Sequence, residues 1–177
     1  MVHRTAALEG AHGIGFGRRS TVRAPGAIGF FRELPDDTDA RVHSNRAAEL
    51  IVSGDAELAL EHLRAALRAE PTEAVHHNRL GMALKHLGRH PEASLAFDAA
   101  LEREPQLASA LYNKACLAAV GGRLSDALEL LDGAFPAHPT LFTELAMLDP
   151  DLARLRNQPA FKALLSGSAR KLDRFDS

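Results

Sequence analysis

A repeat of 34 residues constrains this chain more than any other feature. When the sequence is shifted by 34 residues against itself, matching residue types coincide in three successive copies. The matched positions are Pro71, Pro105 and Pro139; Gly54, Gly88 and Gly122; Ala59, Ala93 and Ala127; Ala66, Ala100 and Ala134; Leu63, Phe97 and Leu131; Leu67, Leu101 and Phe135; and Ala47, Gly81 and Ala115. This register, which holds without an insertion, predicts three copies of one structural unit.

Each copy is predicted to be a helical hairpin. Stretches rich in Ala and Leu, which are strong helix formers, lie on both sides of the glycine in each copy. The glycine can adopt the left-handed conformation that ends a helix, so it permits a sharp turn. The proline then ends the second helix, because it cannot continue the hydrogen-bond ladder. One hairpin cannot bury its apolar face alone, so the copies are predicted to stack.

The repeats divide the chain into three parts. Residues 38–139 hold the three hairpins, at about 40–73, 74–107 and 108–139, with Thr38 or Asp39 as the first N-cap. Residues 1–37 are Gly-rich and mildly basic, and they are predicted to be mostly irregular and flexible. Their apolar stretch at 27–34 is expected to cap the first hairpin, with the groove or a partner as alternatives. Residues 140–177 are predicted to form capping helices and a tail.

Composition narrows the class of function. The net charge of -2 favours neither nucleic acid nor an anionic membrane as a partner, and no apolar run is long enough to cross a bilayer. A single cysteine excludes an internal disulfide and favours a reducing compartment. The first residues lead into Gly-rich sequence, which differs from the apolar core of a signal peptide. We therefore predict a cytoplasmic protein, and the sequence leaves its oligomeric state open.

The 34-residue period and the residue types at its matched positions, or slots, resemble the tetratricopeptide repeat. The second copy matches best, at Leu80-Gly81, Leu84, Gly88, Ala93, Phe97, Ala100 and Pro105. The first copy departs at Arg46-Ala47, where the family usually has an apolar residue followed by Gly. The third departs at Gly133 and Pro136, which should shorten its second helix. The resemblance implies an all-α fold, a right-handed superhelical stack of helix-turn-helix hairpins known as an α-solenoid.

The sequence after the third copy carries a second resemblance. Asp149-Pro150-Asp151-Leu152, the pair Leu155-Arg156 and the later Pro159 and Phe161 are similar to the segment that closes many bacterial repeat arrays. This resemblance implies a cap, since the end of a solenoid needs a cover for its apolar face. The residues expected to provide it are Leu152, Leu155, Phe161, Leu164 and Leu165. The preferred interpretation gives this segment no role beyond capping.

The family resemblance implies a non-catalytic protein-protein interaction module, an adaptor or scaffold that binds a peptide or partner protein in a concave groove lined by the first helices. One polar slot of that groove holds Asn45, Arg79 and Asn113. An Asn amide both donates and accepts, and an Arg offers a planar fork to a carboxylate. The other candidates are Asn78, Met82, Lys85, His86 and Tyr112, with Ser44, Ala48, Ser109 and Cys116 beside them. The alternative is that the two Asn of the slot are ordinary solvated residues.

Three other functions fit the sequence less well. The first is a small bacterial tetratricopeptide chaperone for a secreted or assembling protein, although the Gly-rich residues 1–37 do not resemble the N-terminal dimerising helix of such chaperones. A metal site is not predicted, because His76 and His77 are adjacent and Gly88 separates His86 from His90. Catalysis by Cys116 is not predicted, because no orienting third group accompanies it. The sequence implies no cofactor.

Overall fold

The computed structural model describes residues 21–22, 32–33 and 39–172. The chain divides into two units, Met1–Asp36 and Asp37–Ser177. In the first unit the described residues form a minimal antiparallel pair, β1 (Thr21–Val22) with β2 (Arg32–Glu33), within a segment that was expected to be mostly irregular. The predicted cap of the first hairpin at residues 27–34 lies outside the described residues except at β2.

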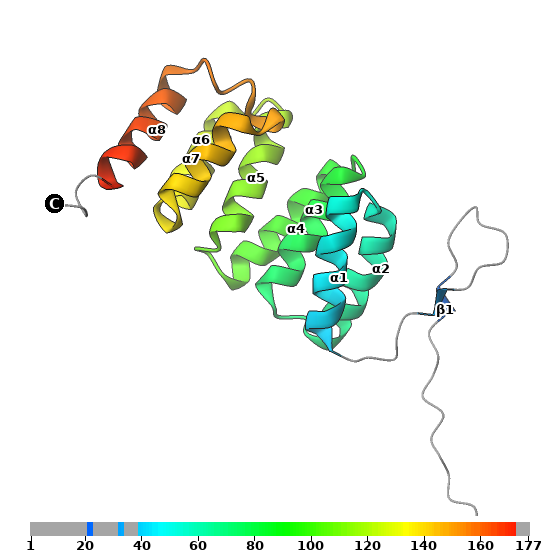
Figure 1. Ribbon diagram of the computed structural model, residues 1–177. Coiled ribbons are helices and arrows are strands. Elements are labelled where there is room, and N and C mark those ends of the chain that lie inside the picture. The colour runs from blue at the N-terminus through cyan, green and yellow to red at the C-terminus, as the bar shows by residue number, and fades with distance from the viewer. Residues whose placement is uncertain (1–20, 23–31, 34–38, 173–177) are drawn as a thin grey trace, which may run out of the picture. The chain divides into compact units, whose positions relative to one another are not determined.

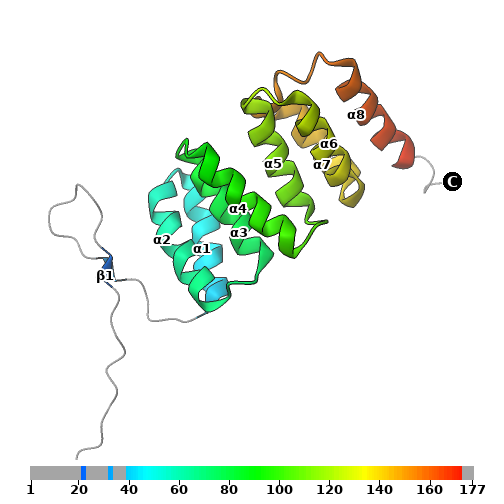
Figure 2. The same ribbon diagram turned by 180° about the vertical axis from the view of Figure 1, so that it is seen from behind.

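All regular secondary structure in the described residues of the second unit is helical. Its three hairpins are α1 (Ala40–Ser53) with α2 (Ala56–Ala69), α3 (Ala74–His86) with α4 (His90–Arg103), and α5 (Ala108–Val120) with α6 (Leu124–Ala134). They are followed by the 3-10 turn η1 (Phe135–Ala137), α7 (Pro139–Leu148), the 3-10 turn η2 (Pro150–Leu152) and α8 (Pro159–Leu172). Figures 1 and 2 show the hairpins stacked in chain order. The predicted all-α solenoid is confirmed. None of the helices described is long and apolar enough to span a membrane.

The turn inside each hairpin is made by the predicted glycine. Gly54, Gly88 and Gly122 have φ values of 91°, 70° and 79°, in the left-handed region that costs glycine no steric strain. The amide after each glycine bonds back across the helix end, as Asp55 N does to the carbonyl of Leu50 at 2.8 Å. This bond satisfies a carbonyl that the end of the helix would otherwise leave without a partner. The start of the array is also as predicted, with Asp39 capping α1 by accepting from the amide of Arg41 at 2.8 Å.

Two of the repeated positions set how closely the two helices of a hairpin approach. The small-residue slot holds Ala47, Gly81 and Ala115, and the large-residue slot holds Leu63, Phe97 and Leu131. A Cβ on Gly81 would lie 2.4 Å from the ring of Phe97, so a larger residue at position 81 would force this ring or the helix backbone to move. The first hairpin has Ala47 in the small-residue slot and Leu63 in the large-residue slot. These two residues are buried, as are Gly81 and Phe97. A smaller partner thus leaves room for the alanine methyl group.

The third hairpin differs from the first two in the length of its second helix. Helix α6 has 11 residues, whereas α2 and α4 have 14 each, as Gly133 and Pro136 predicted. Pro139, however, begins α7 and does not simply end α6. Proline suits the first turn of a helix, where its missing N–H leaves no hydrogen bond unmade.

The core of the array consists of two clusters. The first joins buried residues of α1 to α4, among them Leu63 and Phe97, with Leu117 of α5. The second joins α5 and α6 to the C-terminal segment. In it Leu152, Leu155 and Phe161 have no exposed surface, and Leu164 and Leu165 pack against them. These are the residues that were predicted to cap the last hairpin.

Candidate functional site on the concave face

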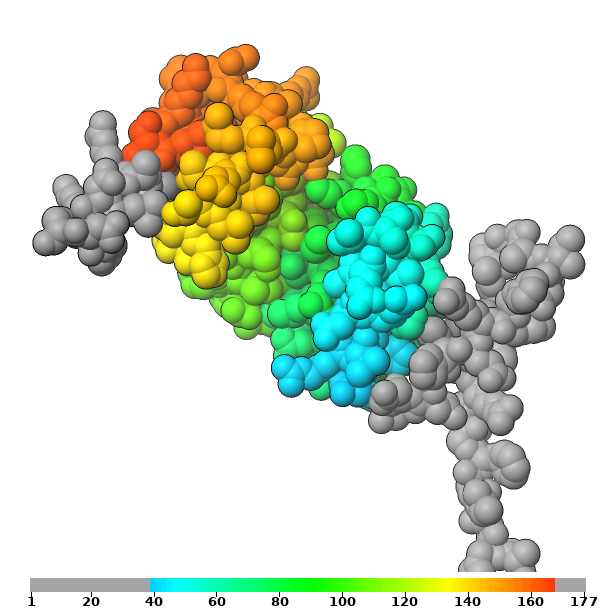
Figure 3. All heavy atoms as spheres, viewed as in Figure 1, coloured from blue at the N-terminus to red at the C-terminus, as the bar shows by residue number. Residues whose placement is uncertain are grey.

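The first helices of the hairpins lie next to one another along one face of the array. Helix α3 contacts α1 on one side and α5 on the other. Figure 3 shows this face, with α1 in cyan and α7 in yellow standing forward of the green segments between them. The predicted groove residues belong to α1, α3 and α5, so the question is which of their polar atoms are free for a ligand.

Arg79 is the cation at the centre of the predicted polar slot. One of its guanidinium nitrogens, Nη1, donates to Oγ of Ser44 at 2.5 Å and to Oδ1 of Asn45 at 3.2 Å. The side chain is half-buried, and this burial lowers the pKa of Arg79 by removing water from the charge. Both acceptors are neutral, and the described residues include no carboxylate paired with it.

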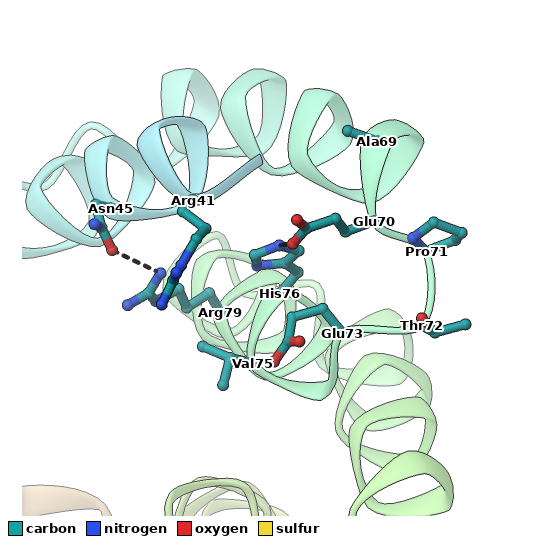
Figure 4. A pocket seen from close by; sticks show the side chains of 10 residues that line it. All are labelled: Arg41, Asn45, Ala69, Glu70, Pro71, Thr72, Glu73, Val75, His76 and Arg79. Carbon is teal, nitrogen blue, oxygen red and sulfur yellow. Dashed lines mark hydrogen bonds and ion pairs between the residues drawn. The ribbon is translucent and has the colours of Figure 1, made fainter. Parts of the chain in front are cut away.

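A pocket of about 590 Å³ opens beside Arg79. It lies between the N-terminal halves of α1 and α3 and the connection from α2 to α3, as Figure 4 shows. Its lining consists of Arg41, Asn45, Ala69, Glu70, Pro71, Thr72, Glu73, Val75, His76 and Arg79. The volume is in the range of sites that hold small molecules or a few peptide side chains.

The buried His76 ties the wall of this pocket together. Its Nδ1 lies 2.9 Å from Oγ of Ser44, and its Nε2 lies 3.1 Å from Oε2 of Glu70. Ser44 is itself fully buried and accepts from Arg79. A chain of hydrogen bonds thus runs from Glu70 through His76 and Ser44 to Arg79. This chain engages Nη1 of Arg79, while the other guanidinium donors make no hydrogen bond within the described residues.

The other asparagines of the predicted site are used within the fold. Asn78 is buried, and its Nδ2 donates to Oγ of Ser109 at 3.2 Å. Asn113 donates from Nδ2 to Oδ1 of Asn78 at 3.0 Å. The sequence predicted that Asn113 offers its amide to a ligand backbone, with a solvated side chain as the alternative, and that Asn78 faces the groove. The structure instead connects α3 to α5 through them, because side chains one repeat apart meet when the hairpins stack.

The C-terminal segment occupies the next part of the face. Asp151 accepts from Nζ of Lys85 at 2.5 Å, and Asp149 accepts from the hydroxyl of Tyr112 at 3.2 Å. Tyr112 is buried and its ring stacks on Phe142, with centroids 5.3 Å apart. Lys85 and Tyr112 were predicted to face a ligand, and in the structure both make contacts with the C-terminal segment. The preferred interpretation of the segment as a cover alone therefore omitted these polar contacts.

Cys116 lies next to the carboxylate of Asp149. It is fully buried, and its Sγ lies 3.4 Å from Oδ2 of Asp149. Burial and the negative charge of Asp149 raise the pKa of the thiol. Burial, followed by the neighbouring Cys116 and Asp149, raises the pKa of Tyr112. A buried, protonated thiol is a poor nucleophile.

The described residues contain one group with the composition of a metal site. Cys116, Asp149 and Asp151 each bring a ligand atom within 4.8 Å of the others. The ammonium of Lys85 already sits on Asp151, and the raised pKa of the thiol opposes the thiolate that a metal would need. The chemistry of this donor set therefore suits an internal ion pair better than a cation site.

The last two predicted residues differ in exposure. Met82 is half-buried and packs against the first core cluster, whereas His86 is exposed at the final residue of α3. Of all the predicted groove residues, only Asn45 and Arg79 line the pocket.

Sequence reasoning missed most of the pocket. Arg41 precedes Asn45 by four residues, and Val75 precedes Arg79 by four, so helical spacing could have placed these pairs on one face. Glu70 and Glu73 come from the connection between hairpins, which the groove prediction did not include.

No protein-family model and no curated protein matches the sequence. Solved structures do match, with 15% identity to MamA over 80% of this chain and 82% of that one, at a TM-score of 0.61. The first tetratricopeptide domain of RPAP3 (Spaghetti), bound to the HSP90 peptide SRMEEVD, is 14% identical over 78% of this chain and 96% of that one, at 0.55. This chain has the tetratricopeptide-repeat fold.

A further tetratricopeptide match comes from Yersinia enterocolitica. Its type III secretion chaperone SycD, in complex with a peptide of the translocator YopD, is 16% identical over 77% of this chain and 96% of that one, with a TM-score of 0.53. At these identities the likeness establishes the fold, and the site must be argued from the residues of this chain.

Proposed function

We propose that this chain is a non-catalytic protein-interaction module, an adaptor or scaffold that binds a segment of a partner protein in the pocket beside Arg79, through a carboxylate of that segment. Two of the structural neighbours are complexes with peptides, which supports a peptide as the ligand. The remaining argument comes from the charges of the pocket.

Arg79 carries the proposal because its charge is half-buried without a paired carboxylate in the described residues. Arg89 is a useful contrast. Its guanidinium donates from Nε and Nη2 to the two carboxylate oxygens of Glu92, at 2.7 and 2.6 Å, and this hydrogen bonding raises the pKa of Arg89. Arg79 makes no such pair with any residue that the structure describes. A carboxylate from a partner would supply it with both a counter-charge and further hydrogen-bond acceptors.

The proposal is tested by capture of partners on immobilised protein. Parent protein, Arg79→Gln and Arg103→Gln would be exposed to the same lysate, since Arg103 is an exposed arginine of α4 outside the pocket. We expect a set of proteins that the parent and Arg103→Gln retain and that Arg79→Gln loses. Retention of the same proteins by all three folded variants would contradict the proposal.

The strength of the contact is then measured by calorimetry with the captured partner. An ion pair at a half-buried site should contribute more than the ~0.2–1 kcal/mol of an exposed pair, so Arg79→Gln should weaken binding by about tenfold. Binding should also weaken as salt is added, because ions screen the pair.

A chaperone for a secreted or assembling protein stays as the second candidate, because SycD shares the fold and was solved with a peptide of its translocator. Both candidates use the same pocket. The identity of the captured partner separates them, since a chaperone would retain one unassembled client and an adaptor would retain a folded complex.

A further inference from the structure

The pocket beside Arg79 holds charges of both signs. The cations Arg41 and Arg79 come from α1 and α3, and the anions Glu70 and Glu73 come from the α2–α3 connection. Figure 4 shows the two guanidinium groups on the same side of the pocket, next to Asn45, and the carboxylate of Glu73 across from them near Val75. The opposite charges face the same space.

These charges are only partly neutralised by one another. Glu70 is paired with His76 at 3.1 Å. Glu73 is exposed, and the described residues contain no ion pair made by Glu73, Arg41 or Arg79. The pocket therefore offers at least one unpaired cation and one unpaired anion to a ligand.

We propose that the pocket selects a peptide segment that carries an acidic and a basic side chain close together. The carboxylate binds Arg79, beside Arg41, and the cationic group binds Glu73. This inference rests on the proposed function and adds the chemistry of the partner to it. A wholly acidic segment fits less well, because Glu70 and Glu73 would repel its further carboxylates.

The apolar part of the lining suits the same kind of ligand. Ala69, Pro71 and the half-buried Val75 lie among the charged residues. They offer a surface against which the methylene stem of a Lys or Arg can pack while its charged end reaches a carboxylate. A free inorganic anion would use only the arginine side of the pocket.

The test uses blocked peptides that differ only in charge. Each peptide has a Gly and Ser framework and carries Glu with Lys, Glu with Gln, Gln with Lys, or Gln with Gln, separated by zero, one or two glycines. Binding to the full chain is followed by amide chemical shifts in NMR at millimolar peptide. We expect the Glu–Lys peptide at its best spacing to bind about fivefold more tightly than Glu–Gln, the effect of one exposed ion pair of ~1 kcal/mol.

Variants of the protein show which pocket residue binds each charge of the peptide. Glu73→Gln should remove the advantage of Lys and keep the advantage of Glu, and Arg79→Gln should do the reverse. Glu102→Gln and Arg103→Gln are matched controls, because both side chains are exposed on α4 outside the pocket. They should bind all peptides as the parent does.

The outcomes separate this inference from the proposed function. If Glu–Gln binds the parent as tightly as Glu–Lys at every spacing, or if Glu73→Gln leaves the advantage of Lys intact, the inference is wrong and the Arg79 carboxylate site stands. If neither Glu nor Arg79→Gln changes binding, both are wrong. An absence of saturable binding by all the peptides would also overturn both.

Discussion

Gly81 has no side chain because the ring of Phe97 fills the space where one would lie. The first and third hairpins place alanine in this slot, opposite Leu63 and Leu131, and those leucines are as fully buried as Phe97. The large and small slots are therefore matched within each hairpin. We expect this match, and not the helix propensity of the small residue, to decide which residue the slot accepts.

Substitution of Gly81 tests this expectation. Gly81→Ala places a Cβ 2.4 Å from the Phe97 ring, and we expect a loss of ~1–3 kcal/mol in unfolding free energy, although alanine is the better helix former. Urea unfolding followed by circular dichroism measures it. The double variant Gly81→Ala with Phe97→Leu reproduces the pairing of the other hairpins and should recover much of the loss. A single variant more stable than the parent would refute the steric explanation.

The thiol of Cys116 gives a second prediction at the same scale. Burial and Asp149 raise its pKa, so the folded protein holds it as the unreactive thiol at neutral pH. We expect a disulfide-exchange reagent to label it at least ~100-fold more slowly in the folded protein than in urea, where the thiol is solvated. Equal rates in the folded and unfolded states would show that the site opens readily.

At the scale of elements, the cap is attached by two kinds of contact in η2. Asp151 pairs with Lys85, with side chains 29% and 20% exposed, while the neighbouring Leu152 has no exposed surface. Partly exposed pairs contribute little, whereas a large apolar side chain contributes several-fold more. We therefore expect apolar burial to hold the cap, and the ion pair to set how η2 lies on the face.

Two substitutions at neighbouring positions separate these contributions. Leu152→Ala should lower the unfolding free energy by ~2–5 kcal/mol, and Asp151→Asn by about 1 kcal/mol or less. Calorimetric melting at two salt concentrations measures both, and only the small effect of Asp151→Asn should shrink at high salt. If Asp151→Asn proves the more damaging of the two, the ion pair and not the apolar contact holds the cap.

At the scale of the whole molecule, the helical unit has two core clusters along one axis. One lies in the first two hairpins, and the other joins the third hairpin to the cap, with Leu117 of α5 reaching into the first cluster. Stability in stacked repeats is close to a sum of local and nearest-neighbour contributions. A cavity in one cluster should therefore loosen its own hairpins more than the others.

Hydrogen exchange can locate such loosening. Leu63→Ala and Leu131→Ala remove the same side chain from equivalent, fully buried slots of the first and third hairpins. We expect each to cost ~2–5 kcal/mol locally. Leu63→Ala should speed exchange mainly in α1 to α4, and Leu131→Ala mainly in α5 to α8, as measured by mass spectrometry of peptic fragments. Uniform acceleration along the chain in both variants would show that the clusters unfold as one.

The sequence alone determined the features that depend on contacts close in the chain. Gly54, Gly88 and Gly122 end helices through their own backbone freedom, and Asp39 caps the helix that follows it. The 34-residue repetition of small and large apolar residues then specifies one hairpin and its stacking on the next, because each hairpin meets only its neighbours. These interactions could be predicted without coordinates.

The site depended on contacts between distant segments, which only the tertiary structure decided. Asp151 reaches Lys85 across 66 residues, and Glu73 faces Arg79 from a connection whose path depends on how two hairpins pack. Helical periodicity places Tyr112 and Asn78 on a face but does not say what will cover that face. The burial of Tyr112 and Asn78 follows from the distance between stacked hairpins and from the position of the cap. The pocket beside Arg79 is a part of the predicted groove that stays open.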